Sequence, residues 1–304
     1  MKPGKDHLVD KTAHKKLILV GPAAAGKTTF KRVFFENVNP LKLLDEGLDP
    51  TRGIENTAFS FFSQMIGVWD LAGQELNSWL GDRQDVFEKA SSIVCMVSVT
   101  DPLKENASSL LNLLKIKQDN APEADLFILI NKCDLVPLLD ARSVVQNLGD
   151  LIRVRHPDLV QACTPGTFNL TSIAEPYFLK TLAVAFKIIK SCVREHSIQV
   201  PAIDLQSAER RMRILMAHSP NVWFSSLDVS HKLSMSMVET HRHLEALRAG
   251  GYVSKRRSTF FSITDKGAFI ANALKQQPDT LQNDEARNNL TFFMNRYQPS
   301  KFRK

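Results

Sequence analysis

The chain has 304 residues, of which 43% are hydrophobic, and this length and composition predict two domains with proper cores. Residues 1–195 carry equal numbers of basic and acidic side chains, so the formal net charge of +7 arises in residues 196–304. No run approaches the roughly 18 apolar residues of a membrane span, and the lysine-rich start lacks the apolar core of a signal peptide. We therefore expect a cytoplasmic protein without a transmembrane segment. Its basic last third either meets nucleic acid, an acidic partner or an anionic membrane surface, or forms a solvated face.

The four cysteines contain no C-x-x-C pair and lie mostly in apolar stretches; they are Cys95, Cys133, Cys163 and Cys192. This pattern predicts buried, reduced thiols rather than disulfides or a zinc site.

Six short apolar runs rich in β-branched and aromatic residues predict strands at 16–20, 58–62, 65–70, 93–99, 126–131 and 168–170. Only Ser63 and Gln64 separate the second run from the third, which is too short for a parallel crossover and predicts an antiparallel hairpin at one edge. Helices are expected at 27–36, 102–117, 140–155 and 175–194. The alternation predicts an α/β fold with a six-stranded, mostly parallel, doubly wound sheet.

Pro201 and the segment around it do not continue a helix, so we expect a domain boundary after residue 195 and a linker at 196–204. Helices are predicted at 209–217, 227–233, 236–249 and from 265, with β-rich segments at 252–254 and 259–263. In the third helix we expect Met237, Thr240, Leu244 and Leu247 to face a core, and Ser236, Glu239, Arg242 and His243 to point outward.

A last helix is predicted at 283–297, with an apolar stripe of Ala286, Leu290, Phe293 and Tyr297. We expect this stripe to dock on the C-terminal domain or on its copy in a dimer, in preference to the N-terminal domain. Residues 1–13 are expected to be flexible.

The segment Gly21 to Thr29, GPAAAGKTT, fits the phosphate-loop pattern G-x-x-x-x-G-K-[ST] and lies between a predicted strand and a predicted helix. Gly21 and Gly26 allow a tight turn whose backbone N–H groups point at phosphates. Lys27 then reaches the outer phosphates, and Thr28 is a ligand for Mg²⁺. The pattern predicts binding of a nucleoside triphosphate.

Further residues that suit a nucleotide site follow the phosphate loop in the chain. Asp70, at the end of a strand, is suited to the metal, Gly73 to a γ-phosphate contact, and Gln74 to orienting an attacking water. Thr51, in a polar connection, is a candidate switch threonine that closes onto Mg²⁺, and the adjacent Arg52 is a minor candidate for a contribution to turnover.

The sequence Asn131-Lys132-Cys133-Asp134 follows another predicted strand. There Asp134 can accept hydrogen bonds from the N1 and N2 hydrogens of guanine while the Lys132 stem covers the ring.

Taken together, the motifs GPAAAGKT, Thr51, DLAGQE, NKCD and Thr171-Ser172-Ile173 resemble the Ras-like small GTPases over residues 14–195. PTRGIE and VWDLAGQE are most similar to the Rag/Gtr branch, with an Arf-like alternative. The resemblance implies a P-loop NTPase G domain that binds GTP or GDP with Mg²⁺. It implies catalytic roles for Gln74, Lys27 and Thr51, and metal ligation by Thr28, Thr51 and Asp70. The nucleotide-binding residues it implies are Gly21, Ala24, Ala25, Gly26, Lys27, Thr28, Thr29, Gly73, Asn131, Lys132, Asp134, Thr171, Ser172 and Ile173.

Residues 205–278 resemble winged-helix regulators through THRHLEALRAGGYV and FSITDKGA. The resemblance implies that the hairpin tip, with Lys255, Arg256 and Arg257, contacts a partner, which is either DNA phosphates or a protein. Three hypotheses remain: a GTPase switch whose nucleotide state controls this domain, a nucleotide-regulated DNA-binding regulator, and a scaffold without turnover. For the switch we expect activating and exchange proteins, a possible dimer, and unassisted turnover on the order of 10⁻⁴ to 10⁻³ s⁻¹.

Overall fold

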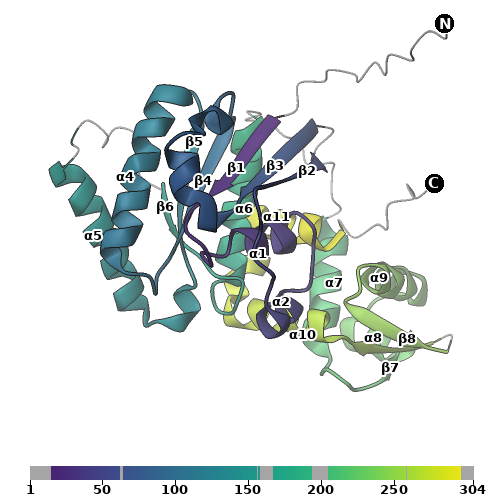
Figure 1. Ribbon diagram of the computed structural model, residues 1–304. Coiled ribbons are helices and arrows are strands. Elements are labelled where there is room, and N and C mark those ends of the chain that lie inside the picture. The colour runs from purple at the N-terminus through teal and green to yellow at the C-terminus, as the bar shows by residue number, and fades with distance from the viewer. Residues whose placement is uncertain are drawn as a thin grey trace, which may run out of the picture.

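The computed structural model describes residues 15–61, 64–155, 157, 167–193, 205–257 and 259–295. Its centre is a six-stranded sheet in the order β2-β3-β1-β4-β5-β6 (Figure 1). The strands are β1 (Lys15–Val20), β2 (Ile54–Phe61), β3 (Gln64–Leu71), β4 (Ser92–Ser98), β5 (Asp125–Asn131) and β6 (Phe168–Leu170). Every pairing within this sheet is parallel except the one between β2 and β3. The predicted α/β sheet with one antiparallel edge strand is confirmed.

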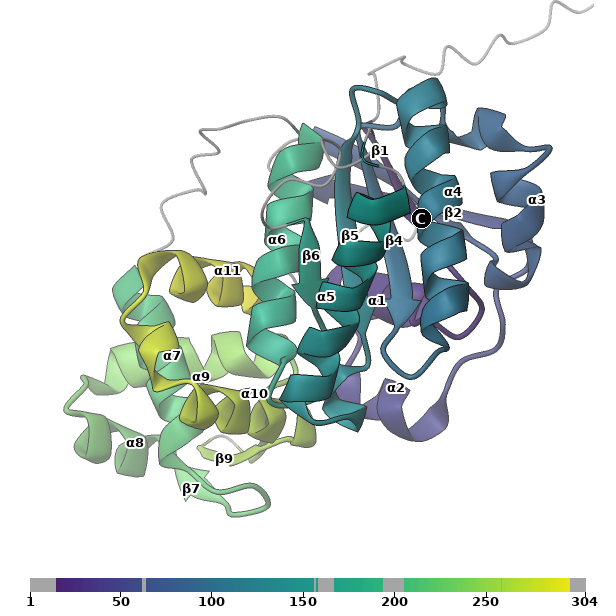
Figure 2. The ribbon, with the colours of Figure 1, turned by 90° about the vertical axis from the view of Figure 1, so that its left-hand side faces the viewer.

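Helices cover both faces of the sheet (Figure 2). They are α1 (Lys27–Phe34), α2 (Pro40–Glu46), α3 (Leu76–Leu80), α4 (Leu103–Asn120), α5 (Leu138–Arg155) and α6 (Phe178–Val193), with short 3-10 helices η1 (Gly73–Glu75), η2 (Gln84–Phe87) and η3 (Cys133–Leu135). Side chains of β1 alternate between two cores, because successive strand residues point to opposite faces. Leu17 and Leu19 belong to the core under α1 and α6, and Ile18 and Val20 to the core under α3, α4 and α5.

The short helices α2 and α3 were not predicted, and the strand β2 is longer than predicted. The helix α2 begins with Pro40 after the cap residue Asn39, whose side chain accepts a hydrogen bond from the Leu41 N–H at 3.2 Å. The strand β2 begins at Ile54 rather than at residue 58, because its largely polar first residues pair with Val68–Leu71 at the exposed edge of the sheet. These residues show no apolar period, so the pattern could not reveal them.

The C-terminal part contains a second, three-stranded sheet in the order β7-β9-β8. Its elements are α7 (Leu205–Ala217), β7 (Phe224–Ser225), α8 (Ser226–Leu233), α9 (Met237–Ala249), β8 (Val253–Arg256), β9 (Phe260–Ile263), α10 (Asp265–Gln276), η5 (Pro278–Leu281) and α11 (Asp284–Asn295). Ser225 and Ser236 begin α8 and α9 with reciprocal capping boxes. Of these elements only β7 and η5 were not predicted.

Two orientations expected in α9 are wrong. His243 is fully buried, because it lies one turn after Thr240 on the face that packs into the core. Met237, in the first turn of the helix, is instead exposed. Burial, aided by the neighbouring Arg211 and Arg242, lowers the pKa of His243 to about 4, so the ring is neutral at physiological pH.

A single apolar core runs from the α1 and α6 face of the large sheet into the C-terminal part. Phenylalanines of α11 form much of the junction: the Phe293 ring centroid lies 6.4 Å from that of Phe34 and 5.8 Å from that of Phe178. Phe292 contacts Phe61 and Phe186 at 6.3 and 5.4 Å. The predicted docking of α11 on the C-terminal part is seen in its packing against α7, but its aromatic side chains dock on the N-terminal part as well, which was the less favoured alternative.

Several predictions concern residues outside the described ranges: the flexible segment 1–13, the linker 196–204, Cys163 and Tyr297. Cys95, Cys133 and Cys192 are buried free thiols, as predicted. Within the described ranges, every helix is too short or too polar to span a bilayer.

Candidate functional site

A cavity of about 590 Å³ opens at the carboxyl ends of the parallel strands, where the loops after β1, β3, β5 and β6 meet. Open α/β sheets bind ligands at this edge. Thirteen residues predicted for the site line this cavity: Ala24, Gly26, Lys27, Thr28, Thr29, Thr51, Gly73, Gln74, Asn131, Lys132, Asp134, Ser172 and Ile173. The fold thus gathers segments that are far apart in the chain around one space.

Four other predicted residues, Gly21, Ala25, Asp70 and Thr171, lie behind this lining. The Ala25 carbonyl accepts a hydrogen bond from Asn131 Nδ2 at 2.9 Å, and Thr171 Oγ1 donates to Asn131 Oδ1 at 3.3 Å. Asn131 therefore connects the loop after β1 with the loop after β6, and its amide is occupied by protein groups on both sides.

Glycine is required at two points of the cavity wall. Gly26 has a φ of +94° directly before α1, and a side chain there would collide with the Asn131 amide. At Gly73 a Cβ would overlap the backbone of Ala23. The loop after β3 consequently packs backbone to backbone against the phosphate-loop segment.

Lys27 is buried in the wall of the cavity. Its Nζ donates to the carbonyl oxygens of Gly21 at 2.9 Å and of Pro22 at 2.7 Å. Burial lowers the pKa of Lys27 to about 8, and the nearby Asp70 carboxylate offsets only part of this effect. A desolvated ammonium held by neutral carbonyls is well suited to gain an anionic partner.

Three oxygen-bearing side chains from different segments meet beside Lys27. Thr28 Oγ1 donates to Asp70 Oδ2 at 2.7 Å and lies 2.8 Å from Thr51 Oγ1. Asp70 Oδ1 is buried and has no hydrogen-bond partner among the described residues, and burial raises the pKa of this carboxyl. Two hydroxyls and a carboxylate are hard oxygen ligands that fit Mg²⁺, which is bound by few protein groups and keeps several waters. No cluster of three or more His, Cys, Asp or Glu side chains in the described ranges offers another metal site.

The loop that carries Thr51 and the loop that carries Gln74 are hydrogen-bonded to each other. Gly53 N donates to Glu75 Oε1 at 2.7 Å, and Ala72 N donates to the Gly53 carbonyl at 2.9 Å. The Trp79 indole N–H in turn donates to the Ala72 carbonyl at 2.9 Å. Hydrogen bonds therefore join the two loops directly.

Gln74 is exposed and also lines a neighbouring cavity of about 540 Å³ together with Asp49, Pro50 and Arg52. Arg52 is thus near Gln74, as the minor candidate role in turnover would need.

Sequence reasoning missed one wall of the main cavity. It is formed by α2 and the loop that follows, with Leu43, Leu44, Leu48 and Pro50, and by Leu135 after Asp134. Leu44 and Leu135 are exposed at the cavity mouth. The Asn39-Pro40 pair, an N-cap followed by proline at the first helical position, was a signal that could have revealed α2.

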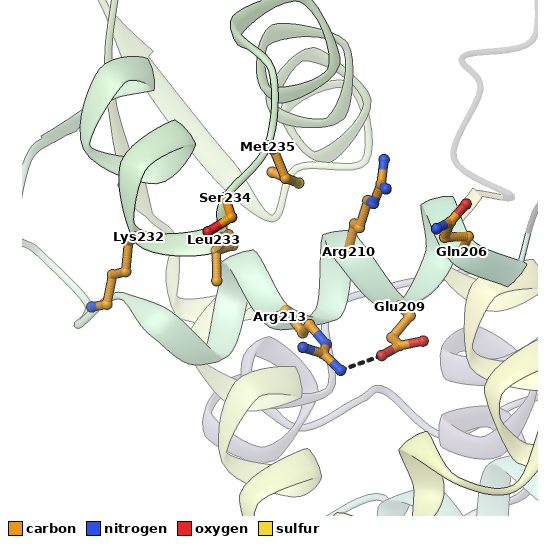
Figure 3. A pocket seen from close by; sticks show the side chains of 8 residues that line it. All are labelled: Gln206, Glu209, Arg210, Arg213, Lys232, Leu233, Ser234 and Met235. Atoms are coloured by element: carbon orange, nitrogen blue, oxygen red, sulfur yellow. Dashed lines mark ion pairs between the residues drawn. The ribbon is translucent and has the colours of Figure 1, made fainter.

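A third cavity, of about 370 Å³, lies between α7 and the turn that joins α8 to α9 (Figure 3). Arg213 and Glu209 point toward each other there and pair at 2.5 Å. Arg210 pairs with Glu239, which was predicted to point outward, at 2.5 Å. The guanidinium groups of this cavity are therefore neutralised by carboxylates.

Comparison with known proteins gives a family match. The family model described as the Gtr1/RagA G protein conserved region matches residues 16–218. GTP-binding protein GTR1 of Saccharomyces cerevisiae is 27% identical over 130 residues, which cover 41% of this chain and 41% of that protein. Ras-related GTP-binding protein A of Dictyostelium discoideum is 25% identical over 156 residues, covering 49% and 50%. The chain thus spans half or less of the length of these relatives.

Among solved structures, translation elongation factor SelB of Methanococcus maripaludis aligns with a TM-score of 0.43 and 14% identity, over 60% of this chain and 35% of that one. This likeness is too partial to support an inference about function.

Proposed function

The chain belongs to the Gtr1/RagA family of G proteins, and from this premise we propose that it binds GTP and GDP in the main cavity and hydrolyses GTP slowly, as a molecular switch. The observation that carries the proposal is the meeting of Thr28, Thr51 and Asp70 beside Lys27. It joins the phosphate-loop segment, a loop able to respond to a γ-phosphate, and the end of β3, which Gly73 follows. Such an arrangement distinguishes a triphosphate from a diphosphate.

Seven residues in or behind the cavity wall have a proposed task. Lys27 exchanges its carbonyl partners for phosphate oxygens, and Gly73 N–H faces the γ-phosphate. Thr28, Thr51 and Asp70 would hold Mg²⁺, which would neutralise charge on the phosphates. Gln74 orients the water that attacks the γ-phosphorus, and GDP and phosphate result. Asp134 accepts from the guanine N1 and N2 hydrogens and thereby rejects adenine.

Single-turnover hydrolysis of GTP tests the proposal. We expect a wild-type rate on the order of 10⁻⁴ to 10⁻³ s⁻¹ and a decrease of about tenfold or more for Gln74→Leu, which retains binding but cannot orient water. An unchanged rate in this variant would remove Gln74 from the mechanism. No binding of GTP or GDP by the wild-type protein would refute the proposed function.

The switch also needs a readout, which we place in the C-terminal part, as a winged helix that contacts an effector protein. Ser225, Phe260 and Arg256 are opposite one another in the sheet and thus share its outer face, while the next pair, Phe224 and Phe261, is buried. Trp223 and Phe260 are each 44% exposed, and the Arg256 guanidinium lies 6.0 Å from the Trp223 ring. Exposed aromatic and arginine side chains are typical of protein interfaces.

The exposed aliphatic residues Val222 and Leu227 flank this face and favour a protein over nucleic acid, because aliphatic side chains do not stack on bases. Of the cations at the hairpin, Lys255 is already paired with Glu245 at 2.6 Å, whereas Arg256 and Arg257 are exposed. A partner segment with apolar and acidic residues would match both features. Duplex DNA binding that weakens with salt, and is lost when Lys255, Arg256 and Arg257 become Ala, would instead support a DNA-binding regulator.

A further inference from the structure

The helix α10, in the C-terminal part, contacts both walls of the nucleotide cavity. On one side it packs against α2 (Figure 1), and Leu43 of α2 lines the cavity. On the other side, Gln276 Nε2 donates to Glu175 Oε2 at 2.7 Å, and Gln277 Nε2, at the helix end, donates to the Pro176 carbonyl at 2.6 Å. Glu175 and Pro176 follow the Ser172 and Ile173 lining within a few residues of chain.

Apolar packing holds α10 in this place. Its Phe269, Ile270 and Leu274 are buried in the same core as Leu43. The Phe269 ring meets the edge of Phe178, at the start of α6, with 4.8 Å between the ring centroids. The helix is therefore a rigid support rather than a loosely attached segment.

A third contact is made at the first turn of α10, by the buried side chain of Lys266. Its Nζ donates to Asn37 Oδ1 at 3.3 Å and to the Gly250 carbonyl at 3.4 Å, and lies 4.6 Å from the centroid of the Tyr252 ring. Asn37, with a φ of +56°, stands at the corner between α1 and α2. Hence α10 contacts the α1–α2 corner, α2 itself and the loop after β6.

We propose that α10 positions the two walls of the nucleotide cavity, so that the C-terminal part slows the release of bound guanine nucleotide. This inference rests on the proposed function. A nucleotide leaves when the α2 wall and the Ser172 loop separate, and α10 is bonded to both. Gln276, Gln277 and Lys266 are then positioning residues, which act through the segments they hold and do not touch the nucleotide.

Release of the fluorescent analogue mant-GDP from the full chain, chased with excess GDP, tests this inference. The double variant Gln276→Ala/Gln277→Ala loses both contacts to the Ser172 side, and these lie at the surface, so the fold is retained. We expect dissociation about three- to tenfold faster, equivalent to roughly 0.7–1.4 kcal/mol. The neighbouring exposed Lys275→Ala is the matched control, and its release rate should equal that of the wild type. A double variant that releases mant-GDP within twofold of the wild type overturns the inference.

A second readout separates positioning from general loosening. Because the lost contacts are on the guanine side, release of mant-GDP and of the non-hydrolysable mant-GppNHp should accelerate by the same factor, while the melting temperature of the nucleotide-free protein stays unchanged. Unequal factors for the two nucleotides, or a lowered melting temperature, would contradict a positioning role. If the wild-type protein does not bind mant-GDP at all, the proposed function fails and the inference fails with it.

Discussion

Two lysines are buried, but only one of them could be recognised from the sequence. Burial lowers the pKa of both Lys27 and Lys266 to about 8. Lys27 was predicted because it stands at a fixed place in a motif. Lys266 has no motif, and its burial results from packing against Tyr252 and Asn37, which are distant in the chain. Chemistry that depends on long-range packing has no local sequence signal.

The buried ammonium of Lys266 makes stability depend on pH. Its pKa is about 8 in the folded state and near 10.5 when unfolded, so between these values the unfolded chain binds more protons and stability rises with pH. Tyr252, which faces Lys266, remains neutral in this window because burial raises its pKa. Relative to Lys266→Met, the wild type should gain up to about 3 kcal/mol between pH 7.5 and 10.5. Urea unfolding of both proteins across this range measures the difference in their free energies of unfolding. A difference that does not change with pH would contradict a lowered pKa of Lys266 in the folded state.

The carboxylate of Asp134 sets base specificity in the proposed function. Asp134→Asn replaces one acceptor by an amide donor, so the guanine N2 hydrogens lose their partner while the carbonyl at the same position of xanthine gains one. We expect GDP affinity to fall by about 100-fold, as for the loss of a charge-assisted hydrogen bond, and affinity for xanthosine diphosphate to rise. Titration with the two diphosphates measures both changes. Equal affinity of the variant and the wild type for GDP would remove Asp134 from base recognition.

Among elements, long periodic helices and the motif-bearing loops were predictable, and short segments were not. The four helices α1, α4, α5 and α6 show clear apolar spacing, and the glycines of the phosphate loop reveal its tight turn directly. In contrast, α2 has seven residues and the first half of β2 is polar, so neither shows an apolar period, and the Asn39-Pro40 cap is the local signal from which α2 could have been predicted. The wall formed by α2 was therefore missing from the predicted site, although every predicted site residue lies in the cavity lining or behind it.

The tail helix α11 contributes to stability through its aromatic residues. Phe293 is 2% exposed and contacts the rings of Phe34 and Phe178. Phe293→Ala should lower the free energy of unfolding by about 3 to 5 kcal/mol, because it leaves a cavity in the junction. Phe260→Ala, at an exposed ring, should change it by less than about 0.5 kcal/mol. Chemical denaturation of both variants checks this contrast, and similar values for the two would show that α11 is not docked as described.

At the scale of the whole molecule, one core joins the large sheet to the C-terminal part. Apolar contacts of α10 and α11 cross between the large sheet and the rest of the C-terminal part. Folding of the two parts should therefore be coupled. We expect a single calorimetric transition whose measured enthalpy equals the van't Hoff enthalpy. Two resolved transitions would show that the parts unfold independently.

The hydrogen bond from Trp79 to the Ala72 carbonyl has a practical consequence. Trp79 is fully buried, and the Arg83 guanidinium lies 4.0 Å from its ring centroid. Ala72 directly precedes Gly73, so a rearrangement at Gly73 changes the hydrogen bond to the indole N–H. A change in this bond alters the energy of the excited indole. The protein therefore carries its own optical reporter, and its emission spectrum should follow the exchange of one nucleotide for the other without any attached dye.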